Sequence, residues 1–217
     1  MKPLLCYVTD RNVLAEPSLL TEQISRAVAA GIDWVQIREK DLSARELLAL
    51  ARAALKVAAA SAHASATRII INDRLDVALA AGAGGVHLGE ASMTVAAVSA
   101  WRRAAGLREN SSMEFLIGAS CHSVEAVRTA ERDGADYAIF GPVFATPSKG
   151  KFGAPQGIKL LAEASKAVRI PVLAIGGITE ENARECFGAG AAGIAAIRMF
   201  SEARDVTELA VRLRETR

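Results

Sequence analysis

A pattern that recurs along the chain, in which an alanine-rich or charged segment passes through a glycine into an apolar run, constrains the fold more than any other feature. It occurs at Gly31 (AAGIDWVQI), Gly82 (AAGAGGVHL), Gly134 (RDGADYAIF) and Gly190 (GAGAAGIAAI), at intervals of 51, 52 and 56 residues. Each glycine suits the left-handed position that closes a helix, and each Val- and Ile-rich run suits a strand buried on both faces. The chain is therefore built from repeats.

Further apolar runs lie between these repeats, at Leu4 to Thr9, Arg68 to Ile71, Phe115 to Ser120 and Pro171 to Ile175. Helical segments separate the strands, with a capping-box spacing at Ser43 and Glu46 and a suitable N-cap at Thr179. Strict alternation of strands and helices predicts a parallel sheet. An open doubly wound sheet would show the same alternation, but eight even units over residues 1–217 favour one domain of the α/β class, a single (β/α)8 TIM barrel.

The composition agrees with such a barrel and argues against other classes of protein. Hydrophobic residues make up 51% of the chain and aromatic residues 5%, which suits branched strands covered by Ala-rich helices. The 26 Lys and Arg residues against 24 Asp and Glu residues give no electrostatic case for a nucleic-acid partner. Three widely spaced cysteines indicate no disulfide framework. Because no apolar run reaches ~18 residues and none resembles a signal segment, we expect a cytoplasmic protein without a membrane partner.

Polar residues gather where the predicted strands end, which is the edge at which barrels of this kind place their ligand sites. They are Asp10, Gln36, Arg38, Lys40, Asn72, Asp73, His87, Glu90, Ser120, His122, Thr146, Ser148, Lys149, Gly176, Gly177 and Arg198. Gln36, Arg38 and Lys40 alternate along the second strand, so their side chains share one face. That face is either solvated or turned into the barrel, where two cations would meet an anionic ligand.

The segments after the third and the sixth strand each allow two interpretations, one structural and one functional. Asn72 and Asp73 suit a helix-capping turn, and they equally suit hard oxygen ligands for Mg²⁺ with phosphates completing the coordination. The segment 141–157 (GPVFATPSKGKFGAPQG) suits a loop that captures phosphate over an active site, or a plain polar surface loop. Its relevant polar groups are Thr146, Ser148 and Lys149.

The ends of the last strands and of the fifth strand also carry candidate groups. Gly176 and Gly177 expose backbone N–H groups to an anion or simply form a turn, and Arg198 adds a cation there or pairs with a carboxylate. His122 is a candidate general acid or base, or a structural histidine. We interpret Cys121 beside it as a packing residue.

With these residues in order, the chain resembles the thiamine-phosphate synthase and thiazole tautomerase superfamily over essentially its whole length. The matching strings are VQIREK, IINDRLDVALAAGAGGVHLGE, IGASCHS, GPVFATPSK and VLAIGGIT. The resemblance implies a barrel that uses Mg²⁺ to join a pyrimidine diphosphate to a thiazole phosphate, with release of pyrophosphate.

The resemblance also implies roles for individual residues. The pyrophosphate and pyrimidine contacts are Gln36, Arg38, Lys40, Asn72 and Lys149, Ser120 lies beside the pyrimidine, and the thiazole-phosphate contacts are Thr146, Ser148, Gly177 and Ile197. Asp73 is the implied metal ligand. We expect the catalytic groups to be Arg38, Lys40, Lys149, Ser120 and His122.

The chain departs from the superfamily pattern at two positions. Ser92, with Glu90 close by, stands where the synthases usually have a second metal-binding Asp, so the expected Mg²⁺ site is Asp73 with Ser92 and Glu90. Arg198 stands where a Ser usually lies beside the thiazole phosphate, and it offers that phosphate a stronger anion ligand together with Gly176 and Gly177.

Three functions stay open at this point. The group Gln36, Lys40, Asn72 and Asp73 favours a synthase, because an isomerase has no pyrophosphate to hold. A thiazole tautomerase is the alternative, since the second Asp is missing, and His122 fits both enzymes. A catalytically silent phosphate-binding barrel is the third. In each case the expected partners are small phosphorylated molecules, and assembly into a homo-oligomer is left open.

Overall fold

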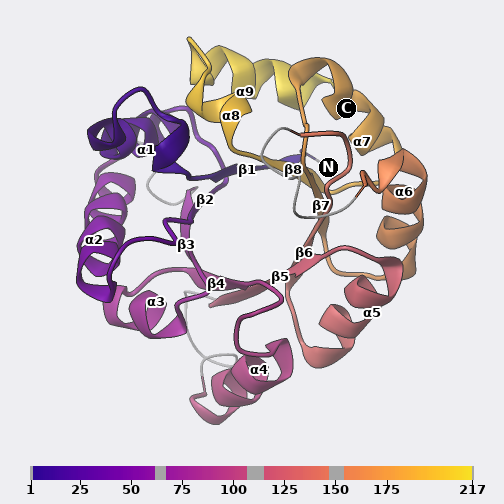
Figure 1. The fold of residues 1–217 in the computed structure, drawn as a ribbon, viewed down its shortest axis with the longest axis horizontal. Helices are drawn as coiled ribbons and strands as arrows, with labels where there is room; N and C mark the ends of the chain where they lie inside the picture. Colours follow the sequence, from indigo (N-terminus) through magenta and orange to yellow (C-terminus); the bar gives the residue numbers. More distant parts are fainter. Residues whose placement is uncertain (1, 62–66, 107–114, 147–153, 217) are drawn as a thin grey trace.

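The strands close into a parallel barrel that is surrounded by helices (Figure 1). This computed structural model describes residues 2–61, 67–106, 115–146 and 154–216. The strands follow one another around the barrel in chain order, and β1 pairs with β8 to close it. Their bounds are β1 Leu4–Val8, β2 Trp34–Ile37, β3 Arg68–Asn72, β4 Gly85–Leu88, β5 Leu116–Cys121, β6 Tyr137–Phe140, β7 Val172–Ile175 and β8 Gly193–Ala196. The predicted (β/α)8 TIM barrel is confirmed.

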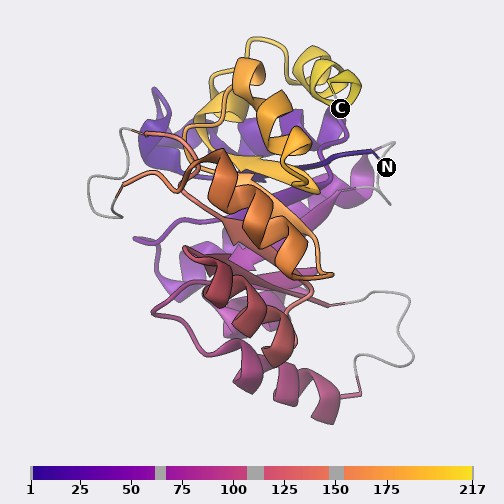
Figure 2. The ribbon, with the colours of Figure 1, turned by 90° about the vertical axis from the view of Figure 1, so that its right-hand side faces the viewer.

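Helices cover the outside of the barrel, as the side view in Figure 2 shows. They are η1 Arg11–Val13, η2 Pro17–Leu19, α1 Leu20–Ala29, α2 Ala44–Ala60, α3 Leu75–Ala81, α4 Val95–Ala104, α5 Val124–Asp133, α6 Gly157–Ala167, α7 Glu180–Gly188, α8 Arg198–Ser201 and α9 Val206–Glu215. Helix α9 lies between α7 and α1 and completes the ring (Figure 1). None of the helices in the described ranges is long and apolar enough to cross a membrane.

The local signals of the sequence are found at the element boundaries. The four repeat glycines have φ values of 67°, 72°, 99° and 92°, and each precedes a strand, β2, β4, β6 or β8. Ser43 and Glu46 form the predicted capping box at the start of α2, and Thr179 caps α7 together with Asn182. The fifth strand begins one residue later than predicted, at Leu116.

Aliphatic side chains and two aromatic ones, Tyr137 and Trp34, fill the inside of the barrel. Tyr137 reaches across the interior and packs against Trp34, with ring centroids 4.5 Å apart. Gly118 on the neighbouring strand makes room for it, because a Cβ there would lie 2.1 Å from Cζ of Tyr137. The barrel is therefore a packed core and not a pore, and a ligand can enter only from one of its ends.

Two aspartates close the amino-terminal end of the barrel. Asp33 accepts a hydrogen bond from the Leu5 backbone N–H at 2.9 Å, and Asp136 accepts one from the Ile117 N–H at 2.7 Å. Arg102, whose side chain is 1% exposed, donates to Asp136 and to two backbone carbonyl groups. Arg102 and Asp136 therefore form a buried ion pair at this end, although Arg102 Nε is buried without a hydrogen-bond partner among the described residues.

Candidate active site

A cavity of about 340 Å³ opens at the carboxyl-terminal ends of the strands. Its walls include the apolar residues Val8, Ile139, Ile175 and Ile197. Its polar lining consists of Asp10, Gln36, Arg38, Lys40, Asn72, Asp73, His87, Glu90, Ser120 and His122. Residues predicted from the second, third, fourth and fifth strands therefore meet in one place.

The second strand brings two cations to this cavity. Arg38 and Lys40 line it together with Gln36, so the inward orientation is the one the chain adopts. Within the described ranges, neither cation has a carboxylate oxygen within 4.0 Å. Two positive charges that form no ion pair in the described part of the chain can bind an anionic ligand, although Asp10, Asp73 and Glu90 line the same cavity.

A chain of amide and carboxylate groups crosses from β2 to the end of β3. Gln36 Nε2 donates to Asn72 Oδ1 at 2.9 Å, and Asn72 Nδ2 donates to Asp73 Oδ2 at 2.7 Å. The interpretation of Asn72-Asp73 as a helix cap is wrong, because the N-cap of α3 is Arg74 and no side chain caps that helix. Gln36 Oε1 is buried and has no hydrogen-bond partner among the described residues. A ligand with an N–H group would satisfy it.

The other carboxylate oxygen of Asp73 contacts the loop after β4. Asp73 Oδ1 accepts hydrogen bonds from Ser92 Oγ and, at 3.3 Å, from the Gly89 N–H. Glu90 has a side chain that is 75% exposed. The described residues contain no group of three His, Cys, Asp or Glu side chains placed to hold a metal ion. The adjacent Asp73 and Ser92 oxygens are nevertheless the donors that Mg²⁺ takes when phosphate oxygens supply further ligands.

His87 is a site residue whose role the sequence did not predict. Its Nε2 lies 2.9 Å from Ser120 Oγ, and its Nδ1 lies 3.2 Å from the Tyr137 hydroxyl. Burial lowers the pKa of His87 from 6.5 to about 4, so the imidazole is neutral near pH 7. It therefore orients the Ser120 hydroxyl without adding charge. One signal in the sequence could have revealed this role. His87 is a polar residue inside an apolar strand, and a buried polar side chain requires hydrogen-bond partners.

His122 reaches the cavity from the end of β5. Its Nδ1 contacts the Gly141 carbonyl oxygen, and its Nε2 lies 4.0 Å from Glu90 Oε1. The imidazole is thus oriented by the backbone and faces a carboxylate. Cys121 beside it is buried, and burial raises the pKa of its thiol to about 12, so the structure agrees with a packing role.

The loop after β6 packs against the glycine pair after β7. Gly176 and Gly177 have φ values of 96° and 64°, and a Cβ on Gly177 would lie 2.4 Å from the Ala145 carbonyl oxygen. Only glycine permits this approach, which brings Thr146 to the same corner of the barrel. Two further predicted residues, Ser148 and Lys149, lie outside the described residues.

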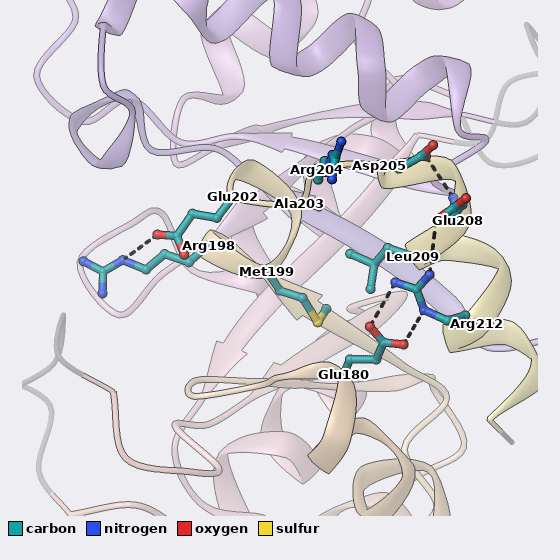
Figure 3. Close-up of a pocket in the computed structure, with 10 residues that line it drawn as sticks. All are labelled: Glu180, Arg198, Met199, Glu202, Ala203, Arg204, Asp205, Glu208, Leu209 and Arg212. Carbon is teal, nitrogen blue, oxygen red and sulfur yellow. Dashed lines mark hydrogen bonds and ion pairs between the residues drawn. The ribbon is translucent and has the colours of Figure 1, made fainter.

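Arg198 is set apart from the other predicted residues. It is the first residue of α8, and its Nε lies 3.7 Å from Glu202 Oε1. It lines a separate cavity of about 690 Å³ on the flank formed by α7, α8 and α9, and Figure 3 shows its guanidinium at the far edge from Arg212. Two interpretations were open for Arg198, a contact with the ligand phosphate and a contact with a carboxylate, and the structure shows the contact with the Glu202 carboxylate. Its neighbour Ile197 lines the central cavity.

The fold and the cavity define a class of protein, a (β/α)8 barrel with a polar site at the carboxyl ends of its strands, where two cations, Arg38 and Lys40, share one cavity with carboxylates that include Asp73. The family model described as thiamine monophosphate synthase matches residues 5–200. The chain belongs to this family.

Individual relatives are similar over nearly the full length. The chain is 46% identical over 193 residues to a putative thiamine-phosphate synthase of Geobacter sulfurreducens, covering 89% of this chain and 84% of the relative. It is 41% identical over 208 residues to a thiamine-phosphate synthase of Chlorobium luteolum, covering 96% and 90%. The solved structure of a thiamine phosphate pyrophosphorylase from Pyrococcus furiosus is 31% identical with a TM-score of 0.80, covering 98% of this chain and 94% of that chain.

Proposed function

We propose that this chain joins a pyrimidine diphosphate to a thiazole phosphate, releasing pyrophosphate and forming thiamine phosphate. It is a transferase of thiamine biosynthesis, and its partners are small phosphorylated substrates. The observation that carries the proposal is the pair of cations, Arg38 and Lys40, in the same cavity as Asp73, in a chain whose relatives bear the name of this activity. A cytoplasmic setting suits its three buried, unpaired cysteines.

The diphosphate end of the reaction needs positive charge. The bond between the pyrimidine methylene carbon and the diphosphate oxygen breaks, its electron pair leaves with pyrophosphate, and the thiazole nitrogen forms the new bond to the carbon. Arg38 and Lys40 neutralise the charge that develops on the leaving group. We assign the same role to Lys149. The pyrimidine ring itself stabilises the developing carbocation.

The pyrimidine end needs orientation. Gln36 Oε1, buried and without a partner in the described part of the chain, accepts a hydrogen bond from an N–H group carried as a substituent on the pyrimidine, and Asn72 holds the Gln36 amide in place. Ser120, oriented by neutral His87, contacts the ring from β5. Together these groups align the methylene carbon with the incoming nitrogen.

The thiazole phosphate is assigned to the opposite corner of the cavity. The backbone at Gly176 and Gly177 offers N–H donors after β7, and Ile197 provides an apolar wall. We assign the hydroxyl groups of Thr146 and Ser148 to the same ligand. To bind the phosphate, Arg198 would have to give up its contact with Glu202. We therefore expect Arg198 to contribute little to the affinity for the thiazole phosphate.

Mg²⁺ is the proposed cofactor, with Asp73 as its carboxylate ligand and Ser92 and Glu90 as neighbouring oxygen donors. When bound, the ion neutralises the diphosphate and stabilises the leaving pyrophosphate. Because Ser92 supplies no negative charge, we expect a high Mg²⁺ requirement. Ser92→Asp should lower the Mg²⁺ concentration that gives half the maximal rate, whereas Ser92→Ala should not. An unchanged or higher requirement in Ser92→Asp would contradict this ligand set.

The function is tested on the purified chain with both phosphorylated precursors, with and without Mg²⁺, beside an assay of thiazole isomerisation. The expected result is formation of thiamine phosphate and pyrophosphate that depends on Mg²⁺. Isomerisation that is lost in His122→Gln would favour the tautomerase, for which His122 in the cavity is the supporting observation. Binding of both precursors without any turnover would favour a silent phosphate-binding barrel.

A further inference from the structure

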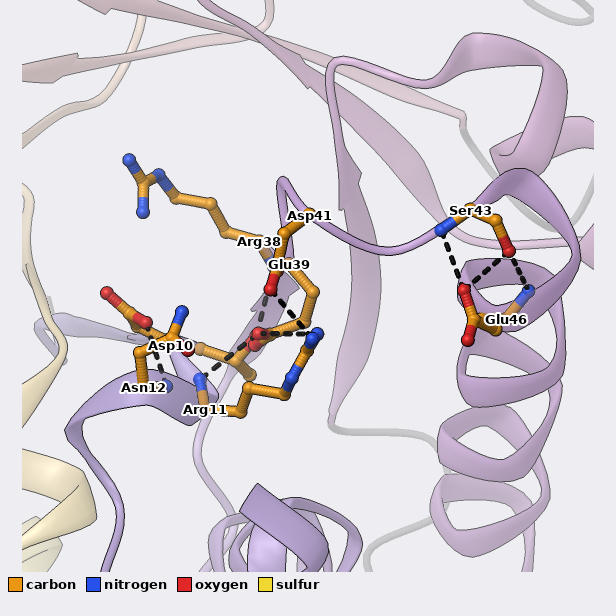
Figure 4. A network of polar contacts seen from close by, with 9 residues as sticks. Asp10, Arg11, Asn12, Arg38, Glu39, Asp41, Ser43 and Glu46 are labelled. Carbon is orange, nitrogen blue, oxygen red and sulfur yellow. Dashed lines mark hydrogen bonds and ion pairs between the residues drawn. The ribbon is translucent and has the colours of Figure 1, made fainter. Parts of the chain in front are cut away.

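A buried carboxylate lies directly behind the cationic side of the cavity. Glu39 stands between Arg38 and Lys40 in the sequence, and its side chain points away from that of Arg38 (Figure 4). The residue is 4% exposed and is absent from the lining of the central cavity. Where a strand residue faces outward, the helices around a barrel ordinarily pack against an apolar side chain, and here the side chain is a carboxylate.

The carboxylate of Glu39 joins the ends of two neighbouring strands. Its Oε1 accepts a hydrogen bond from Thr9 Oγ1 at 2.6 Å, and its Oε2 accepts one from the Arg11 backbone N–H at 3.1 Å. The Arg11 guanidinium lies 3.8 Å away and donates onward to Asp41 at 2.7 Å (Figure 4). The segment after β1 is thereby fastened to the segment after β2.

The same contacts reach the backbone of Arg38. Thr9 Oγ1 accepts a hydrogen bond from the Arg38 N–H at 3.0 Å, so one hydroxyl links Arg38 to the Glu39 carboxylate. The turn that contains Lys40 is closed by the backbone itself, since the Glu39 carbonyl oxygen accepts from the Leu42 N–H at 3.4 Å. The carboxylate therefore holds the backbone of Arg38 through Thr9.

Such a group is costly for the folded state. A carboxylate withdrawn from water needs full hydrogen-bond compensation. Burial raises the pKa of Glu39 above its usual 4.5, and the hydrogen bonds from Thr9 and Arg11 only partly oppose that rise. An apolar residue would fill the space without this penalty, so stability alone does not explain the carboxylate.

We propose that Glu39 is a positioning residue that fixes the direction in which Arg38 enters the cavity, and so sets the affinity for a diphosphate group that it does not touch. The inference rests on the proposed function in one respect, that the ligand is a diphosphate. Arg and Lys side chains lose ~2 kcal/mol of rotamer entropy when they are ordered. A backbone that is fixed before binding adds no further ordering cost to this loss.

The experiment measures two affinities by calorimetry on the full chain, one for inorganic pyrophosphate with excess Mg²⁺ and one for the thiazole phosphate. Glu39→Gln keeps the size of the side chain but leaves only one acceptor for two donors. We expect its Kd for pyrophosphate to rise by about tenfold, with the Kd for the thiazole phosphate unchanged. Thr9→Val, which removes the linking hydroxyl, should have the same selective effect. Asp41→Asn is the matched control, because it removes only the exposed partner of Arg11.

Each result decides the proposal. An equal loss of both affinities would make Glu39 a general scaffold residue, and unchanged pyrophosphate affinity in both Glu39→Gln and Thr9→Val would overturn the proposal. Absence of pyrophosphate binding in the native chain would overturn it as well. If Glu39→Gln does not fold, Thr9→Val still decides between these outcomes. Selective loss of pyrophosphate binding in a chain that makes no thiamine phosphate would uphold the positioning role and refute the proposed function.

Discussion

The two ends of the barrel use the same kinds of charged residue in opposite ways. At the amino-terminal end, Arg102 is 1% exposed and donates to Asp136 and to backbone carbonyl groups. At the carboxyl-terminal end, Arg38 and Lys40 face a cavity and have no carboxylate within 4.0 Å in the described ranges.

The difference separates stability from binding. A buried cation that is paired with a carboxylate holds the strand ends together, and removing one partner leaves the other uncompensated. A cation without a protein partner contributes little to folding and keeps its charge for a ligand. Substitutions at the two ends should therefore change different measurements.

The largest effect is expected at the amino-terminal end. Arg102→Leu leaves the Asp136 carboxylate without its cation and should lower the free energy of unfolding by about 3 to 5 kcal/mol, as measured by urea denaturation. Pyrophosphate affinity of the folded fraction should stay unchanged. Arg132→Leu, which breaks an exposed pair with Asp133, is the control and should change stability by less than about 1 kcal/mol. A loss equally small in Arg102→Leu would mean that this ion pair does not stabilise the barrel.

The second-largest effect is expected for His87, inside the barrel, and it concerns how the free energy of unfolding depends on pH. His87 has a pKa of about 4 in the folded chain against a usual 6.5, so the unfolded state binds a proton first as the pH falls. The stability that His87 contributes above pH 6.5 is therefore lost between pH 6.5 and 4, on the order of 3 kcal/mol in total.

This dependence is measured as the slope of unfolding free energy against pH. His87→Gln should flatten the slope between pH 6.5 and 4, whatever its stability at pH 7. Tyr137→Phe should keep the native slope, because burial and not the Tyr137 contact is the largest cause of the lowered pKa. An unchanged slope in His87→Gln would show that another group accounts for the acid sensitivity.

The third effect is expected at the cations of the cavity. Lys40→Ala should lower turnover by about ten- to a hundredfold, because a charge-assisted hydrogen bond contributes about 1.5 to 3 kcal/mol. Its free energy of unfolding should stay within about 0.5 kcal/mol of the native value. Lys56→Ala, on the exposed face of α2, should change neither. Native turnover in Lys40→Ala would remove this residue from the proposed mechanism.

The smallest effect is expected at Arg198. Because this side chain is 47% exposed and lies near Glu202, Arg198→Ser should weaken binding of the thiazole phosphate by at most about fivefold. Arg198→Glu should weaken it more by placing a negative charge beside the phosphate. Titration with the phosphate and with its unphosphorylated alcohol isolates the phosphate contribution. If Arg198→Glu binds the phosphate as tightly as the native chain, Arg198 does not face that ligand.

The fold could be predicted from the sequence because its signals are local. Each repeat glycine ends a helix by its own backbone conformation, and the capping box at Ser43 and Glu46 spans only three residues. The closure of the barrel followed from the number and even spacing of the strands. The start of the fifth strand was displaced by one residue, since Phe115 and Leu116 are equally apolar.

The site could be predicted only in part because its contacts are long-range. Alternation placed Arg38 and Lys40 on one face but could not say which face looked inward. The contacts of His87 with Ser120 and Tyr137 join residues 33 and 50 positions apart, and no local pattern encodes them. The burial of Glu39 depends likewise on Thr9, which lies 30 residues away.

Asp73 carries a consequence for attempts to improve the protein in the laboratory. Its φ of 62° is the one positive value outside glycine in the described chain, and this conformation costs a non-glycine residue on the order of 1 kcal/mol. Glycine adopts it without that penalty, but glycine would lose the hydrogen bonds that the Asp73 carboxylate accepts from Asn72, Ser92 and Gly89, each worth about 1 kcal/mol or more. A library selected only for resistance to heat would therefore keep the carboxylate at position 73, whether or not its members still form product. Retention of Asp73 in such a library is then no sign of retained activity, and rounds of selection should alternate between heat and product formation.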